Sequence, residues 1–169
     1  IKSFILVEHS TFLKGCFFMF CIFQGDVVFH ADVFEGNVTF NFLTFSNYVK
    51  FDSCTFKKPL DFANSTFKED AEFTRSKYCD ESNFSFLNFN KRSWFLSNTF
   101  NKSAFFMGTN FNEKINFWGS VFDGGLDLMF TQFKDIDISW YQIKNRVYCD
   151  PLISYKIMKT FEEKRQLDD

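Results

Sequence analysis

The sequence predicts an all-β solenoid with four-sided coils of about 22 residues and a C-terminal α-helical cap. Three observations predict it. The 169 residues include 29 Phe. Most of these recur in two interleaved series, each with a period of eleven residues. The short segments between successive Phe residues alternate in length and composition, so that only every second eleven-residue unit is equivalent.

The two Phe series run without a slip for about 120 residues. The first is Phe12, Phe23, Phe34, Phe45, Phe56, Phe67, Tyr78, Phe89, Phe100, Phe111, Phe122 and Phe133; the second is Phe18, Phe29, Phe40, Phe51, Phe62, Phe73, Phe84, Phe95, Phe106, Phe117 and Leu128. On a helix, steps of five and six residues would produce two separate stripes, and the intervening Thr, Asn, Ser, Gly and Asp are poor helix formers. The period therefore indicates short strands.

Each short strand has two positions that point to the same side, the Phe and the residue two before it. That earlier position is small or apolar almost throughout, as in Val27, Val38 and Leu60, with Asp32 and Asn98 as exceptions. The residue between the two inward positions is rich in Thr and Asn. We therefore predict about six coils, each with its Phe side chains inside.

The corners of the predicted coil are of two kinds. Three-residue corners, such as Gln24-Gly25-Asp26 and Lys68-Glu69-Asp70, are polar and turn-forming. Two-residue corners alternate between an apolar type, with Phe20, Phe42, Phe86 and Phe130 at multiples of 22, and a type with Ala31, Ser53 and Gly119. The alternation favours a 22-residue coil.

Four-sided coils with a large central residue and a small residue two before it resemble the pentapeptide-repeat family, in its Phe-rich variant. The segment Thr55-Phe56-Lys57-Lys58-Pro59-Leu60-Asp61-Phe62 carries this pattern, although alternate sides have six residues instead of five. The resemblance covers residues 1–138 and implies a right-handed quadrilateral β-helix. It implies little about function, because such repeats serve unrelated roles.

Residues 139–169 are predicted to form the helical C-terminal cap. Trp140 to Tyr148 is expected to form a short helix, and Asp150-Pro151 has the pattern of an N-cap followed by proline at the first helical position. A second helix is therefore expected from Pro151 to Gln166. This tail is loosely similar to the region that follows Phe-rich repeats in pentapeptide-repeat membrane proteins with ion-channel-like helices. Ile1 and Val7 continue the Phe register, so the chain is expected to be a fragment of a longer protein.

Composition and motifs favour a protein without catalytic chemistry. The 19 Lys and Arg nearly balance the 21 Asp and Glu, which argues against nucleic-acid binding. The longest apolar run, Cys16 to Phe23, is too short to cross a membrane. No nucleophile elbow, phosphate loop or metal-binding spacing is present, so the sequence predicts no cofactor, metal site or enzyme. The inward positions of Cys16, Cys21 and Cys54 suggest thiols used as filler in a reducing, cytoplasmic compartment.

The remaining candidate site is apolar surface at the two-residue corners. Residues predicted to bind a partner on the first edge are Phe17, Met19, Phe20, Phe42, Phe86, Phe105, Met107, Met129 and Phe130; those on the second edge are Trp94, Leu96 and Trp118. Exposed apolar patches of this kind usually mark interfaces. The alternative is that these side chains fold over the corners and stack on each other.

The sequence thus favours a non-enzymatic scaffold that binds a protein partner or a second copy. Two alternatives stay open. The chain could be the soluble, cytoplasmic domain of an ion-channel-like membrane protein, or a DNA mimic that binds topoisomerases. The mixed charges of the corners count against the mimic, because a mimic needs a strongly negative face.

Overall fold

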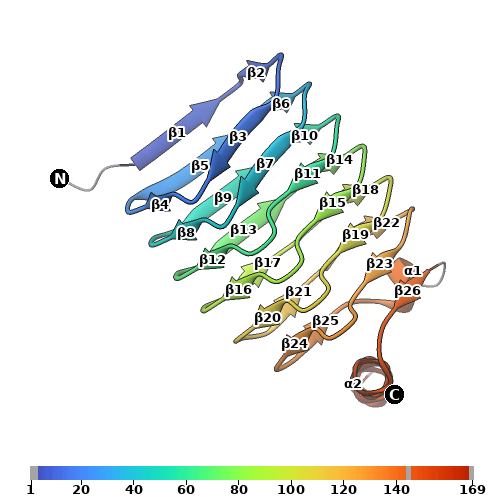
Figure 1. The fold of residues 1–169 in the computed structure, drawn as a ribbon. Coiled ribbons are helices and arrows are strands. Elements are labelled where there is room, and N and C mark those ends of the chain that lie inside the picture. Colours follow the sequence, from blue (N-terminus) through green and yellow to red (C-terminus); the bar gives the residue numbers. More distant parts are fainter. Residues whose placement is uncertain (1–3, 144–145, 168–169) are drawn as a thin grey trace.

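The fold is a right-handed β-solenoid of about six turns, with a helix at its C-terminal end. The structure is a computed structural model, and it describes residues 4–143 and 146–167. Figure 1 shows the coils stacked in sequence order, with β1 and β2 at one end of the stack and α2 at the other. The predicted fold class is confirmed.

Four parallel sheets form the sides of the solenoid, which we call sheets A to D in chain order. Sheet A contains β1 (Phe4–Glu8), β5 (Asp26–His30), β9 (Val49–Asp52), β13 (Ala71–Thr74), β17 (Ser93–Trp94), β21 (Ile115–Asn116) and β25 (Ile136–Asp137). Sheet B contains β2 (Thr11–Phe12), β6 (Val33–Phe34), β10 (Thr55–Phe56), β14 (Lys77–Tyr78), β18 (Thr99–Phe100) and β22 (Val121–Phe122).

The other two sheets complete the perimeter. Sheet C contains β3 (Cys16–Met19), β7 (Val38–Asn41), β11 (Leu60–Asp61), β15 (Ser82–Asn83), β19 (Ala104–Phe105), β23 (Leu126–Asp127) and β26 (Val147–Tyr148). Sheet D contains β4 (Ile22–Phe23), β8 (Thr44–Phe45), β12 (Thr66–Phe67), β16 (Asn88–Phe89), β20 (Asn110–Phe111) and β24 (Gln132–Phe133).

Neighbouring coils pair in a constant register of one 22-residue turn, as Thr55 does with Lys77. The register shortens by one residue at the last rungs of sheets A and C, where Ile115 pairs with Ile136 and Leu126 pairs with Val147. One corner residue has been lost between β24 and β25, and Ile138 takes the buried inward position in place of Ser139. The β-structure therefore continues past the position at which the Phe series stops in the sequence.

The Phe series fill the interior as four columns of rings. Within a column the rings are stacked nearly parallel: the centroids of Phe73 and Phe95 are 4.7 Å apart, with planes inclined by 7°. Between columns they meet edge to face, as do Phe73 and Phe84 at 77°. Both arrangements are favourable geometries for aromatic pairs. Most of these rings are fully buried, so the Phe columns form the core.

Each two-residue corner begins with a residue in the left-handed backbone conformation. These residues recur every eleven positions: His9, Phe20, Ala31, Phe42, Ser53, Asn64, Arg75, Phe86, Ser97, Gly108, Gly119 and Phe130. A left-handed residue reverses the chain sharply, which gives a corner of two residues between short strands. Residues other than glycine pay about 1–2 kcal/mol for this conformation.

The C-terminal segment differs in part from its prediction. α1 (Trp140–Ile143) is a helix, but Val147–Tyr148 is not helical: it forms β26, because it pairs with β23 and extends sheet C by one strand. The second predicted helix is present as α2 (Pro151–Leu167). Its N-cap is Asp150, which accepts a hydrogen bond from the Ile153 N–H at 3.0 Å. This contact lowers the pKa of Asp150.

α2 lies against the last coil through its apolar face. Ile153 and Ile157 are buried, and Phe161 packs against the core while its ring meets Trp140 edge to face. These residues are spaced at i, i+4 and i+8, which places them on one face of the helix. α1, β26 and α2 therefore cover the C-terminal end of the solenoid.

We predict that Phe84→Ala lowers the free energy of unfolding by about 3–5 kcal/mol, because it leaves a cavity in a packed aromatic column. Phe84 is fully buried between Phe62 and Phe106. Leu should be tolerated better, since Leu128 already ends this column. Urea unfolding of both variants tests the prediction, and equal losses for Ala and Leu would contradict it.

Candidate functional site

Two opposite corners of the solenoid carry the side chains selected from the sequence. The apolar edge is the corner between sheets C and D, where the left-handed residues are Phe20, Phe42, Asn64, Phe86, Gly108 and Phe130. The polar edge is the corner between sheets A and B, where they are His9, Ala31, Ser53, Arg75, Ser97 and Gly119.

The four phenylalanines of the apolar edge are exposed. The exposed fractions are 73% for Phe20, 46% for Phe42, 53% for Phe86 and 65% for Phe130. They also contact their neighbours in the column. Phe20 and Phe42 stack with centroids 4.9 Å apart, and Phe86 lies over Gly108 so closely that a Cβ there would come within 2.6 Å of its ring. Stacking over the corner therefore occurs, but it leaves about half or more of each side chain in solvent.

The apolar edge consists of two clusters. Phe17, Met19, Phe20 and Phe42 form the N-terminal cluster, and Phe86, Phe105, Met107, Met129 and Phe130 form the C-terminal cluster. Between them the same columns hold polar or small residues, among them Asp61, Ala63 and Asn64. The structure thus brings each set together without producing one continuous strip. In the second cluster Phe105, Met107 and Met129 are half-buried.

The three aromatic and aliphatic residues predicted on the second edge do not form a matching cluster. Trp94 and Leu96 are half-buried, and the Arg92 guanidinium lies 5.0 Å from the centre of the Trp94 ring. Trp118 is exposed, one coil further along. Polar side chains dominate the rest of this edge.

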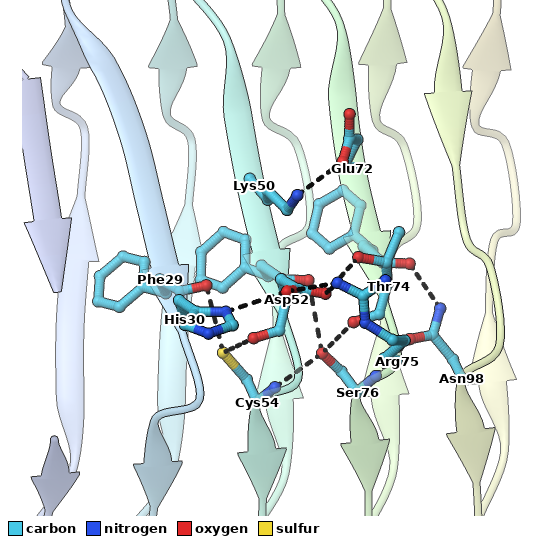
Figure 2. Close-up of polar contacts among 12 residues, drawn as sticks. Phe29, His30, Lys50, Asp52, Cys54, Glu72, Thr74, Arg75, Ser76 and Asn98 are labelled. Carbon is cyan, nitrogen blue, oxygen red and sulfur yellow. Dashed lines mark hydrogen bonds and ion pairs between the residues drawn. The ribbon is translucent and has the colours of Figure 1, made fainter. Parts of the chain in front are cut away.

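Asp52 is the centre of that polar edge (Figure 2). It is only 2% exposed, yet it contacts side chains from two neighbouring coils. Its carboxylate lies 3.0 Å from His30 Nδ1, and it accepts hydrogen bonds from Thr74 at 2.8 Å and from Arg75 at 2.7 Å. Burial by itself would raise the pKa of Asp52, but the bonds from Thr74 and Arg75 lower it. The charged carboxylate is therefore part of the folded corner.

A buried polar column that the sequence analysis did not recognise runs beside this cluster. Its first six members follow the left-handed residue of each corner, and the seventh lies in α1 and continues the 22-residue spacing: Ser10, Asp32, Cys54, Ser76, Asn98, Ser120 and Gln142. Figure 2 shows three of them, Cys54, Ser76 and Asn98, joined by hydrogen bonds. Ser76 accepts from the Cys54 N–H, Asn98 from the Ser76 N–H and Ser120 from the Asn98 N–H. We call this set the corner column.

The corner column explains the two inward residues that broke the apolar pattern. Asp32 and Asn98 occupy positions where a side-chain acceptor satisfies a backbone N–H of the coil before. Ser65 and Thr109 play the same part at the apolar edge. A buried N–H without a partner costs about 1–3 kcal/mol, so these side chains are structural. The recurrence of small polar residues at this position every 22 residues was the sequence signal that could have predicted the column.

The described part of the chain contains neither a group of metal-ligating side chains nor a helix that could cross a membrane. Among residues 4–143 and 146–163, no three His, Cys, Asp or Glu side chains are grouped so that they could hold a metal ion. No helix within the described residues is long and apolar enough to cross a membrane.

Comparison of the chain with protein-family models, with curated proteins and with solved structures finds no match. The proposals below therefore depend on the geometry of the solenoid and its corners.

Asp52 gives the polar edge a defined pH dependence. Because its folded pKa is lowered, its stabilising effect is present above the ordinary pKa of 3.8 and is lost as pH falls through the folded pKa. We predict that Asp52→Asn lowers the free energy of unfolding at pH 7 by about 1–3 kcal/mol. The loss should shrink in acid.

Denaturant unfolding between pH 2.5 and 7 measures this difference. Asp123→Asn, at an exposed corner position, is the matched control and should leave stability unchanged. A deficit for Asp52→Asn that is the same at every pH would refute a role for the ionised carboxylate.

Proposed function

We propose that this chain is a non-enzymatic, pentapeptide-repeat-type scaffold that binds a protein partner or a second copy through its apolar edge. The four-sided coil supports the family assignment, as does the pairing of a central Phe with a small residue two before it. The chain departs from a strict five-residue step because its corners alternate between two and three residues. Alternate sides therefore contain five and six residues.

One observation carries the proposal: exposed Phe side chains occupy left-handed corner positions. Asn64 and Gly108 occupy the same column, and these two residue types adopt the left-handed conformation most readily. Phe suits neither this backbone conformation nor exposure to water. Four such residues on one edge are thus costly for the isolated fold, which favours a role in contact with another molecule.

Stacking of these rings on each other explains the exposed Phe residues less well than contact with another molecule does. Phe20 and Phe42 gain a stacked contact, but Phe130 remains 65% exposed at the C-terminal end of the same column. Met107 and Met129 lie beside the corner and add a flexible, polarizable surface that adapts to a partner. Aromatic residues and Met are enriched at the centres of protein interfaces.

The charge pattern supports a protein partner over mimicry of DNA. Acidic and basic side chains on neighbouring coils are paired, as in Lys57 with Glu35 and Arg92 with Asp70, both 2.7 Å apart. Such pairs at a separation of one coil neutralise the faces of the solenoid. A DNA mimic requires a strongly negative face, so the topoisomerase-binding alternative gains no support.

The proposal also covers chemistry and location. Most buried polar side chains of the corners, such as Ser76, Asn98 and Ser120, are engaged in hydrogen bonds within the solenoid, which supports a structural role over catalysis. Cys54 is buried, and burial raises the pKa of its thiol to about 12, so it remains an unreactive neutral group. Use of a thiol as core filler is consistent with a reducing compartment, and we propose the cytoplasm.

The proposal predicts that replacing Phe20, Phe42, Phe86 and Phe130 together by Asn abolishes association and leaves the solenoid folded. Asn is the chosen substitute because Asn64 already fits this corner position. Light scattering coupled to gel filtration should show a mass above 20.1 kDa for the wild type if the partner is a second copy, and 20.1 kDa for the variant. A monomeric wild type would direct the test to proteins that bind it and not the variant.

A matched control removes exposed apolar side chains from the sheet faces. Ile22→Thr and Val121→Thr copy Thr44 and Thr99, which pair with these residues in the neighbouring coils. The control variant should associate like the wild type. Equal binding by the wild type and the four-Asn variant, or loss of binding in the control as well, would count against the apolar edge.

A further inference from the structure

Three members of the corner column between sheets A and B make two hydrogen bonds each. Ser76, Asn98 and Ser120 accept from the backbone N–H one coil before. They also donate to a carbonyl oxygen 25 residues before, which is that of Phe51, Phe73 and Phe95 respectively. Cys54 and Gln142 make the same donation, to Phe29 and Phe117. The inner positions of the column therefore require a side chain with both an acceptor and a donor.

Asp32 is the member that cannot meet this requirement as a carboxylate. Its Oδ1 accepts a hydrogen bond from the Ser10 N–H at 2.7 Å. Its Oδ2 is buried and has no hydrogen-bond partner among the described residues, and the residue as a whole is 0% exposed. For Asp32 the equivalent carbonyl, one coil and one side earlier, is that of Val7 on β1. An ionised carboxylate has no proton to donate to it.

We propose that Asp32 is a proton-dependent latch for the first coil. As a neutral carboxylic acid, it accepts from Ser10 through Oδ1 and donates its Oδ2–H to the Val7 carbonyl, which completes the column. When Asp32 loses this proton to water, its Oδ2 and the Val7 carbonyl oxygen face each other in a buried corner with no hydrogen between them. The segment from Val7 to Ser10 then separates from β5, so that water can reach the carboxylate.

The electrostatic surroundings of Asp32 agree with this geometry. Burial raises the pKa of Asp32, although backbone contacts with Ser10 and His30 favour the charged form. The titratable groups around it are Glu8 and His9 on the first coil, His30 on β5, and Asp52 and Cys54 on the next coil. His9 and His30, when protonated, oppose the latch, whereas the Asp52 charge is held by its own partners, Thr74 and Arg75.

The sign of the effect follows from linkage. Because the folded pKa lies above the ordinary value of 3.8, the neutral acid stabilises the corner fully below that value. The equilibrium constant for opening the first coil then rises by up to tenfold per pH unit, until pH passes the folded pKa and the constant levels off. This direction is opposite to that of Asp52.

Amide hydrogen exchange of Ser10 measures the opening directly. After correction for intrinsic exchange rates, the Ser10 opening constant of the wild type should rise with pH above 3.8 and then become constant. Asp32→Asn should abolish this rise and keep Ser10 protected at every pH, since Asn98 shows that an amide satisfies both contacts.

A gain-of-function variant keeps the test decisive if Asp32→Asn alters folding. Asn98→Asp should introduce the same pH-dependent opening at Ser76, whose N–H bonds to residue 98, and leave Ser10 unchanged. The latch is overturned if the Ser10 pH profile is the same in the wild type and Asp32→Asn. It is also overturned if the Asp32 carboxyl titrates at or below 3.8 by carbon NMR.

Discussion

The register of one coil on the next, with each residue beside its equivalent one full turn later, is the constraint on which the other features depend. It places Phe on Phe in four columns, so that each ring stacks on its equivalents and meets the adjacent columns edge to face. A slip of one residue would turn every inward ring outward, because successive side chains of a strand alternate between faces. The aromatic core therefore specifies the register.

The corners impose a second demand, which the same register satisfies. A left-handed residue every eleven positions leaves backbone N–H groups in the interior, and a side chain at the equivalent position of the next coil accepts from them, as Ser65 does for the Leu43 N–H. Ser, Thr, Asn and Asp can supply such an acceptor, whereas Leu43 and Leu87 at the same position cannot. A left-handed corner residue costs least when it is Gly or Asn, so the exposed Phe residues of the apolar edge are unfavourable for the isolated fold. The carboxyl of Asp32 is a second unfavourable feature, because its Oδ2 is buried without a partner among the described residues. These two features are the basis of the two proposals.

The periodicity of the sequence was sufficient to predict the four sides and the 22-residue perimeter, and the Asp150-Pro151 capping pattern was sufficient to predict the helix beginning at Pro151. It could not predict β26, because Val147–Tyr148 is too short to show a strand period and is placed by its pairing with β23. Asp32 and Asn98 were recognised as exceptions to the apolar inward pattern, but their role was missed because the sequence does not give the distance from an inward side chain to a backbone N–H. The residues predicted on the apolar edge lie at its corners or in the strands beside them, but their division into two clusters depends on which of them are neighbours across coils.

The most direct test of this account is a measurement of which strands are neighbours. In the isotope-labelled protein, nuclear Overhauser contacts between backbone amide and α protons report adjacent strands. We expect contacts at a separation of one full coil, between Thr55 and Lys77 and between Lys77 and Thr99. Contacts at half that separation, such as Thr55 with Thr66, would contradict the four-sided coil, since those residues lie in different sheets.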